Sequence, residues 1–215
     1  NAREKGLFIV EELLAGKNYA VVTDAGMPCI SDPGEDLVRL CAEHGIPVEV
    51  VPGPSAVISA LAVSGLVTSR FSFEGFLSTT KKSRFEHLNS LKNYPNTMIF
   101  YEAPHKLCAT LKDMLEVFGD RKISLARELT KIHEEVVRTT LSEAVARYEQ
   151  TPPKGEFVLV LEGAPQKTED AMSFEDAVAL MQTLIDGGTP PAQAAKEAAH
   201  ASGFKKNELY REIVK

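Results

Sequence analysis

Residues 19–34, YAVVTDAGMPCISDPG, join a short apolar run to a loop rich in Gly, Pro and Asp. Tyr19–Val22 has the length and composition of a short buried strand, and an irregular loop from Asp24 to Gly34 follows it. A helical pattern from Glu35 to about His44 comes next. A strand that leads through such a loop into a helix is the repeating unit of α/β proteins, so this stretch predicts that fold class.

The same order extends to both sides of this stretch. Before it, residues 7–15 have the apolar spacing of a helix. After it, Val48–Val51 predicts a second strand, and Pro52–Ala56 predicts a turn that opens a helix ending near Ser64. This alternation predicts a mostly parallel sheet covered by helices.

Alternating patterns continue to residue 163. The polar stretch Ser78–Arg84 predicts a linker or mobile loop, and a helix to about Leu91 follows it. Further elements are expected at Phe71–Glu74, Thr97–Tyr101, Ile123–Arg127, 134–140 and Glu156–Leu161 for strands, and at Pro104–Phe118 and from Ser142 for helices.

Residues 174–213 predict helices only, with Thr189-Pro190-Pro191 starting one and Gly203 separating it from the last. We therefore expect an N-terminal α/β domain at 1–78, a second α/β domain at 79–163 and a helical extension at 164–215.

The composition is that of an ordinary globular protein, with 44% hydrophobic and 25% charged residues. No apolar run approaches the roughly 20 residues that span a bilayer. Three scattered cysteines, Cys29, Cys41 and Cys108, fit neither a disulfide framework nor a zinc site, and favour a reducing cytoplasm. The net charge of −6 means that any nucleic-acid contact must use a local basic face.

Two loops follow predicted strands, where ligands bind in open α/β sheets. In the first, Asp24 or Asp32 could accept from a hydroxyl or ammonium group and free N–H groups could meet a carboxylate; alternatively, Asp32 only caps the next helix. The second, Pro52–Ala56, is equally explained as a turn in which Ser55 caps a helix. Neither loop is a dinucleotide fingerprint or a phosphate loop, which argues against a nicotinamide dehydrogenase and a nucleoside triphosphatase.

Three further polar clusters lie at predicted strand ends: Tyr101–Lys106, Ala126–Lys131 and Lys154–Phe157. A structural explanation makes Arg127 and Glu128 an ion-pair network and His105 a helix-start residue. Three such clusters at corresponding sheet ends favour function. Met27 and Met98 are expected to pack in the interior, and no histidine spacing suggests a metal site, so no metal is predicted.

Taken in order, TDAGMPCISDPG, VVPGPSA, FEGFL, MIFYEAPHK, ARELTKIHEE and KGEFVLVLEG resemble one family. It is the small-subunit ribosomal RNA cytidine 2′-O-methyltransferase family of the tetrapyrrole (corrin/porphyrin) methylase superfamily. The resemblance covers residues 1 to 163, and SGFKKNELYREIVK is similar to the family's helical extension. Family members begin with a further strand and a T-P-I-G-N-L turn, so the chain is expected to start inside the first domain.

The resemblance implies two α/β domains of the tetrapyrrole-methylase type, with S-adenosylmethionine folded in the cleft between them. The cofactor-binding residues that it implies are Asp24, Ala25, Gly26, Met27, Ile30, Ser55, Ala56, Tyr101, Glu102, Ala126, Arg127, Glu156 and Phe157.

Methyl transfer to a ribose hydroxyl benefits from a positioned base; the candidates are Glu102, His105, Glu128 and Lys131. RNA binding would use Lys81, Lys82 and Arg84 together with Lys205, Lys206 and Arg211, although charge alone is equally explained by solvated helix faces. The resemblance also implies a homodimer and, as partner, small-subunit ribosomal RNA. The alternatives are a porphyrin or corrin C-methyltransferase and a non-catalytic module of this fold.

Overall fold

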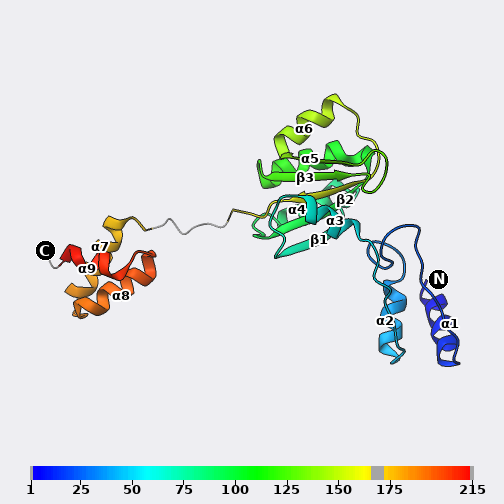
Figure 1. The fold of residues 1–215 in the computed structure, drawn as a ribbon, viewed down its shortest axis with the longest axis horizontal. Coiled ribbons are helices and arrows are strands. Elements are labelled where there is room, and N and C mark those ends of the chain that lie inside the picture. The colour runs from blue at the N-terminus through cyan, green and yellow to red at the C-terminus, as the bar shows by residue number, and fades with distance from the viewer. Residues whose placement is uncertain (1, 166–171, 214–215) are drawn as a thin grey trace. The chain divides into compact units, whose positions relative to one another are not determined.

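The computed structural model of the protein describes residues 2–165 and 172–213, and the chain divides into two compact units at Ala164. The first unit contains α1 (Ala2–Leu14), α2 (Glu35–Glu43), α3 (Ala56–Val63), β1 (Phe71–Phe76), α4 (Lys81–Ser90), β2 (Thr97–Glu102), α5 (Pro104–Phe118), β3 (Lys122–Arg127), β4 (Glu135–Thr140), α6 (Leu141–Gln150) and β5 (Phe157–Leu161). The second contains α7 (Phe174–Asp186), α8 (Pro191–Ser202) and α9 (Lys206–Ile213) (Figure 1). The predicted α/β class is confirmed.

A five-stranded sheet organises the first unit, in the order β1-β2-β5-β3-β4. β1 and β2 are parallel, whereas β5 runs antiparallel to both β2 and β3, and β4 runs antiparallel to β3. The expectation of a mostly parallel sheet was therefore wrong. β1, which we expected in the first domain, pairs with β2 of the second; the division of residues 1–163 into two domains stays a prediction.

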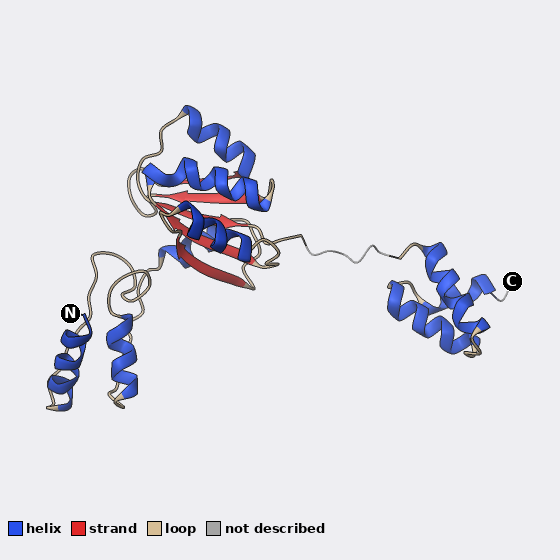
Figure 2. Ribbon diagram, turned by 180° about the vertical axis from the view of Figure 1, so that it is seen from behind, coloured by secondary structure: helices blue, strands red, loops and turns tan. Residues whose placement is uncertain are grey.

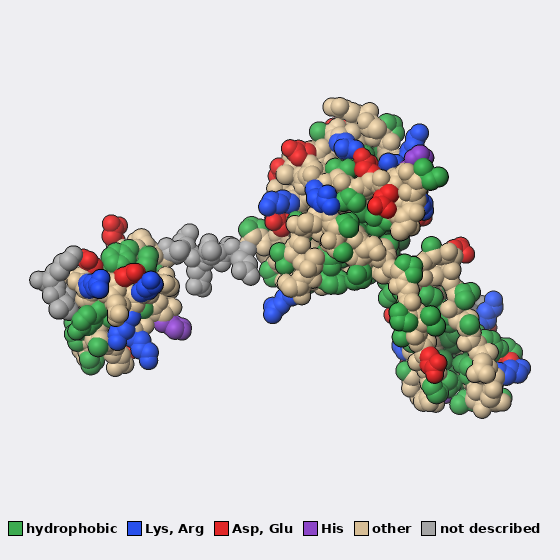
Figure 3. Space-filling view, in the orientation of Figure 1, with side chains coloured by type: hydrophobic (Ala, Val, Ile, Leu, Met, Phe, Trp, Pro, Cys, Tyr) green, Lys and Arg blue, Asp and Glu red, His purple; other side chains and the backbone are tan. Residues whose placement is uncertain are grey.

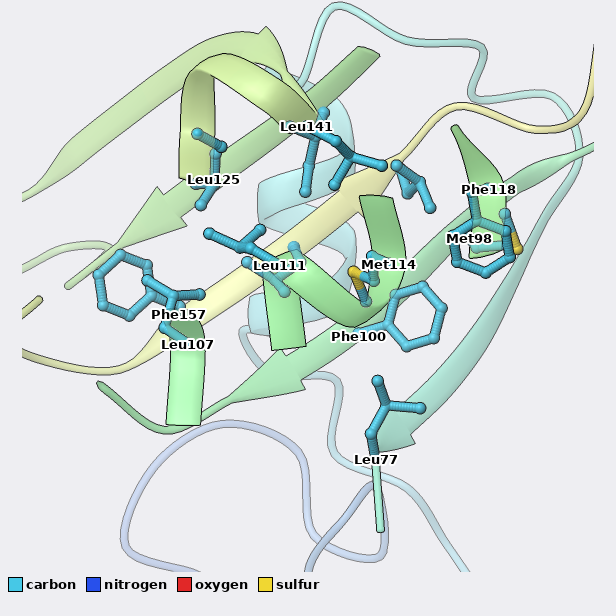
Figure 4. Packing of buried hydrophobic residues seen from close by; sticks show 14 of the residues in the cluster. Leu77, Met98, Phe100, Leu107, Leu111, Met114, Phe118, Leu125, Leu141 and Phe157 are labelled. Atoms are coloured by element: carbon cyan, nitrogen blue, oxygen red, sulfur yellow. The ribbon is translucent and has the colours of Figure 1, made fainter. Parts of the chain in front are cut away.

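Helices cover the two faces of this sheet unequally. Helices α4, α5 and α6 lie on one face (Figure 2), where the main core forms. Figure 4 shows Leu107, Leu111 and Met114 of α5 gathered with Phe100 and Phe157 from the strands. Helix α3 packs on the other face through Val57, Ala60 and Leu61, against strand residues that include Ile99 and Val158. Alternate residues of β2, β3, β4 and β5 thus contribute to two separate cores.

Local sequence explains where the best predicted helices begin and end. Pro104 opens α5 at a position that needs no N–H donor, and Gly119 ends it with a φ of 74°. The hydroxyl of Thr140 accepts a hydrogen bond from the Glu143 N–H at the start of α6, and Ser173 caps α7 in the same way.

The strands predicted at Tyr19–Val22 and Val48–Val51 do not form, and both segments are irregular. In the described part of the chain neither makes a main-chain hydrogen bond, and a strand without a paired neighbour has nothing to hold it extended. Their apolar side chains are instead exposed, at 83% for Val22 and 86% for Val51.

The predicted linker at Ser78–Arg84 was also wrong in part, because α4 starts at Lys81. This helix has few apolar residues, so its sequence resembles a loop. Arg84 anchors it to α5 through an ion pair with Asp113, in which Nε and Oδ2 are 2.6 Å apart and both side chains are mostly buried.

Helices α1 and α2 lie side by side (Figure 1). Several of their apolar side chains are exposed, including Leu7, Phe8 and Val38, and much apolar surface is visible there in Figure 3. In the second unit, α7, α8 and α9 enclose a small core around Met181 and Leu209. Within the described ranges, no helix has the length and apolar character that crossing a membrane requires.

Candidate functional site

The three polar clusters at strand ends, two of which follow a strand and one of which precedes β5, meet at one edge of the sheet. Phe157, at the start of β5, is paired with Glu102 at the end of β2 and with Arg127 at the end of β3. The prediction that these clusters lie at corresponding sheet ends is therefore confirmed. Because side chains alternate along a strand, each cluster sends neighbouring residues to opposite faces of this edge.

Tyr101 and Ala126 face α3. The ring of Tyr101 packs edge-on against Phe73, with ring centroids 5.0 Å apart. Burial raises the pKa of the Tyr101 hydroxyl, the Val57 N–H at the start of α3 opposes that shift, and the charge of Asp32 adds to it. Tyr101 therefore connects the sheet edge to α3 and to the first loop.

The two loops lie against each other beside this tyrosine. A side-chain carbon added to Gly26, whose φ is 77°, would lie 3.5 Å from the Pro54 carbonyl oxygen, and one added to Gly53 would lie 3.4 Å from the Met27 sulfur. Ser31 of the first loop similarly approaches Gly75 of β1. Loops that are about 30 residues apart in sequence thus meet at the α3 face of the sheet edge.

The first loop keeps its hydrogen-bond donors available. Within the described part of the chain, no main-chain N–H from Asp24 to Met27 donates to another main-chain group, and Cys29 and Ser31 have positive φ. Asp24, Ala25, Gly26 and Ile30 are exposed, and Met27 is half-buried. Such a loop can bind a carboxylate through N–H groups and an ammonium or hydroxyl group through Asp24.

The second loop contributes Ser55, which is half-buried, and Ala56, which is exposed at the start of α3. The Ser55 side chain makes no capping hydrogen bond, so the simple capping explanation of this serine fails. Small residues here let a ligand approach the backbone closely.

Glu102 lies on the opposite face and is 3% exposed. Its carboxylate accepts hydrogen bonds from the Ala103 N–H at 2.8 Å and from the Thr110 hydroxyl at 2.6 Å. Both oxygens are used to hold the start of α5. This geometry assigns Glu102 a positioning role rather than that of a base.

Glu128, which follows β3, connects its own loop to the segment that precedes β5. Its carboxylate accepts from the Glu156 N–H at 3.1 Å and from the Lys131 ammonium at 3.1 Å, and these contacts, the first above all, lower its pKa. Glu128 itself has a φ of 49°, and its side chain covers Gly155 so closely that a Cβ there would lie 2.5 Å away. A carboxylate held in this way is a weak base.

His105 differs from the other candidates for the base. It is exposed and lines a cavity of about 220 Å³ with Lys106, Arg84, Glu102 and Thr110. In the described structure its imidazole has no hydrogen-bond or ion-pair partner, whereas Lys131 is paired with Glu128 and lies 3.9 Å from Glu156.

Arg127 and Phe157 line a second cavity of about 320 Å³, together with residues of β4, α6 and the segment that follows α6. Phe157 is 2% exposed and belongs to the main core, while Glu156 is exposed. A ligand on the α3 face would therefore meet the backbone of Glu102, Arg127 and Phe157 rather than their side chains.

The expected RNA-binding residues fall into two groups. Lys81 and Lys82 are exposed at the start of α4, but Arg84 donates to Asp113 and to the carbonyl groups of Ser78 and Thr79. Arg84 is thus already engaged within the fold. In the second unit, the exposed residues Lys205, Lys206 and Arg211 lie in or next to α9.

Sequence reasoning missed the partners that come from other elements. Thr110, Glu135 and Arg147 each pair with a residue at least eight positions away, and no local pattern marks them. The spacing of Thr110 from Glu102 places the threonine two turns into α5, which offers a weak signal only once the helix is known.

Comparison with known proteins gives the family of this chain. The model of the tetrapyrrole (corrin/porphyrin) methylases matches residues 1–145, and the model of the RsmI C-terminal HTH domain matches residues 171–214. Proteins named ribosomal RNA small subunit methyltransferase I are similar to this chain. The protein of Synechocystis sp. is 44% identical over 94% of this chain and 73% of its own length. The protein of Thermotoga maritima is 48% identical over 76% of this chain and 73% of its own length. The chain belongs to the ribosomal RNA small subunit methyltransferase I family. It is accordingly a tetrapyrrole-type methyltransferase, as the ordered motifs indicate.

Solved structures confirm the fold of this methyltransferase. The methyltransferase CobJ matches with a TM-score of 0.54 and 20% identity, over 71% of this chain and 68% of its own. The uroporphyrin-III C-methyl transferase from Thermus thermophilus, complexed with S-adenyl homocysteine, matches with a TM-score of 0.50 and 21% identity, over 74% and 72%. Among the described residues of the methyltransferase, no group of three His, Cys, Asp or Glu side chains could hold a metal ion.

Proposed function

We propose that this methyltransferase transfers the methyl group of S-adenosylmethionine to the ribose 2′-hydroxyl of a cytidine in small-subunit ribosomal RNA. One structural observation carries the proposal: a loop with free N–H groups meets α3 and Tyr101 at the α3 face of the sheet edge. The names of the relatives support a ribosomal RNA substrate, and the complex of the Thermus thermophilus enzyme supports the cofactor class.

The residues at this edge fit the cofactor. The N–H groups of Ala25 and Gly26 would bind its carboxylate, and Asp24 would accept from its ammonium or ribose hydroxyl groups. The remaining proposed cofactor residues, mostly through their backbone, are Met27, Ile30, Ser55, Ala56, Tyr101, Glu102, Ala126, Arg127, Glu156 and Phe157. S-adenosylmethionine would supply an electrophilic methyl group, and the protein would hold the acceptor hydroxyl in line with it.

His105 is our choice for the base, because Glu102, Glu128 and Lys131 are engaged in contacts that hold the fold. His105 lines the cavity beside Glu102, so the acceptor ribose would have to lie across the end of β2 to reach both His105 and a methyl group held on the α3 face. Histidine is the commonest general base, and such catalysis contributes typically ~10²–10⁴-fold. Lys131, with its ammonium next to Glu128, is better placed to hold a phosphate. Lys81, Lys82, Lys205, Lys206 and Arg211 would add RNA contacts from exposed surfaces; the homodimer and the cytoplasmic location also remain proposals.

Two variants of α3 test the cofactor site. Ala56→Glu places a carboxylate at the proposed site, whereas Ser59→Glu places one on an exposed position about one turn further along α3. We expect Ala56→Glu to weaken binding of S-adenosylhomocysteine in calorimetry roughly tenfold or more, because of the added bulk and negative charge, and Ser59→Glu to leave it unchanged. Equal affinity in both variants would contradict the site.

His105→Gln tests the base. We expect kcat for methylation of small ribosomal subunits to fall on the order of 10²-fold, with cofactor affinity retained. A porphyrinoid precursor is offered in parallel as acceptor. Methylation of that precursor in place of RNA would refute the proposed substrate, and an unchanged kcat would refute the role of His105.

A further inference from the structure

The cavity of about 320 Å³ contains more donors than acceptors. It is lined by Arg127, Arg147 and Lys154, with Tyr148 and Phe157 forming an aromatic wall and Glu135 as the acidic side chain. Three cations and one carboxylate give a local charge of +2, in a protein whose net charge is −6. The cavity therefore favours an anion.

The ion pairs within the cavity leave much of this charge uncompensated. Glu135 serves two guanidinium groups, with Oε1 2.7 Å from an Arg147 nitrogen and Oε2 3.4 Å from Arg127 Nε. In the described structure no carboxylate lies within ion-pair distance of the Lys154 ammonium. The main-chain carbonyl oxygen of Lys154 accepts a hydrogen bond from the Arg127 guanidinium group.

Two donors on residues that line the cavity are buried. The Arg127 Nε and the Tyr148 hydroxyl are buried, and neither has a partner in hydrogen-bond geometry. Tyr148 is 6% exposed, and the Arg147 guanidinium lies 5.8 Å from its ring centroid. Because these two atoms have almost no accessible surface, a bound anion would meet the accessible parts of the Arg127 and Arg147 guanidinium groups rather than these atoms.

The position of the cavity relates it to the candidate site. Arg127 directly follows Ala126, whose side chain faces α3. The two are the last residues of β3 and both pair with β5. An extended strand of nucleic acid bound over this edge would bring its backbone to the cavity while a neighbouring ribose lies on the α3 face.

We propose that this cavity is a phosphate-binding subsite for the RNA backbone, in which Arg147 and Lys154 are the exposed contacts and Arg127 the inner one. The inference rests on the proposed function for the identity of the nucleic acid. Arginine binds phosphate oxygens bidentately, and lysine binds them as a point charge. Because only backbone atoms are contacted, the subsite contributes affinity and register but no sequence preference.

The test is the binding of a fluorescein-labelled single-stranded fragment of small-subunit ribosomal RNA, followed by anisotropy over a range of salt concentrations. We expect Lys154→Ala and Arg147→Ala each to weaken binding roughly tenfold, and each to lower the slope of log K against log salt by about 0.7. The control is Lys122→Ala, which removes the same charge from an exposed lysine at the opposite end of β3 and should change neither quantity.

Glu135→Gln gives a change in the opposite direction. Removing the internal carboxylate should tighten RNA binding several-fold in this variant, because the guanidinium groups lose a competing anion. If these side chains only form ion pairs that stabilise the fold, Glu135→Gln should not increase the affinity for RNA. Thermal unfolding of each variant confirms that it is folded.

The outcomes separate the two proposals. Unchanged affinity and slope in Lys154→Ala and Arg147→Ala, or equal losses in Lys122→Ala, would overturn the subsite even if the protein methylates RNA. Inorganic phosphate at millimolar concentration is added as a competitor of the labelled RNA. If it displaces the labelled RNA as well as the unlabelled RNA fragment does, the cavity binds free anions, and the proposed RNA subsite would also be overturned. Loss of binding in these variants without methylation of ribosomal RNA would support the subsite and contradict the proposed function.

Discussion

Replacing Thr110 by Val removes the hydroxyl that donates to the buried Glu102 carboxylate while keeping the shape of the side chain. The donor and acceptor oxygens are 2.6 Å apart, and the two residues are 2% and 3% exposed. A hydrogen bond to a charged group contributes about 1.5–3 kcal/mol, and little water can replace the lost donor at this site. We expect the free energy of unfolding to fall by about 2 kcal/mol.

For a chain of this size, about 2 kcal/mol corresponds to a fall in Tm of roughly 4–8 °C. Urea unfolding followed by circular dichroism measures the free energy, and calorimetry measures Tm. Thr183→Val is the control, because the Thr183 hydroxyl is exposed and donates only to the Ala179 carbonyl oxygen of its own helix. A fall of less than about 0.5 kcal/mol in the free energy of unfolding in Thr110→Val, or an equal fall in the control, would refute the claim that the Glu102 carboxylate holds the start of α5 in place.

Two further predictions concern other parts of the first unit. The N–H and hydroxyl of Ser142 lower the pKa of Asp120, so the stabilising effect of the Asp120 carboxylate is present above about pH 4 and is lost as the pH falls through the lowered pKa. In urea titrations, Asp120→Asn should therefore destabilise the protein at pH 7 and progressively less as the pH is lowered below about 4; a difference independent of pH would contradict this. A Cβ on Gly163 would lie 2.2 Å from the Pro95 carbonyl oxygen, whereas the nearest atom to a Cβ on Gly187 is 3.4 Å away. Gly163→Ala should therefore lower the free energy of unfolding by about 1–3 kcal/mol, and Gly187→Ala should leave it within about 1 kcal/mol of the original value. Equal effects in the two variants would show that the chain around Pro95 moves to accommodate the added methyl group.

The elements with their own boundary signals were predictable from sequence. Helix α5 was expected at Pro104–Phe118 and lies there, because proline and glycine fix its two ends locally. The strand expected at Val48–Val51 depends on a hydrogen-bonded neighbour, which apolar composition cannot supply. The polar segment Lys81–Arg84 is helical because Arg84 pairs with Asp113, a contact that exists only after α5 has packed.

The candidate site shows the same division. The clusters that contain Tyr101, Ala126 and Glu156 were predicted to meet, since residues at corresponding strand ends share an edge. Which face each side chain takes follows from the register of the sheet. The roles of Glu102 and Glu128 as braces could not be predicted, because their partners include a helix residue and a main-chain N–H from a distant loop.

The most direct test of the central claim is the identity of the methylated nucleoside. Small ribosomal subunits are incubated with the protein and S-adenosylmethionine labelled in its methyl group, and the RNA is digested to nucleosides. We predict that the label is recovered in 2′-O-methylcytidine and that His105→Gln reduces it on the order of 10²-fold. Label on a base or in another nucleoside, or none in RNA, would contradict the proposed function.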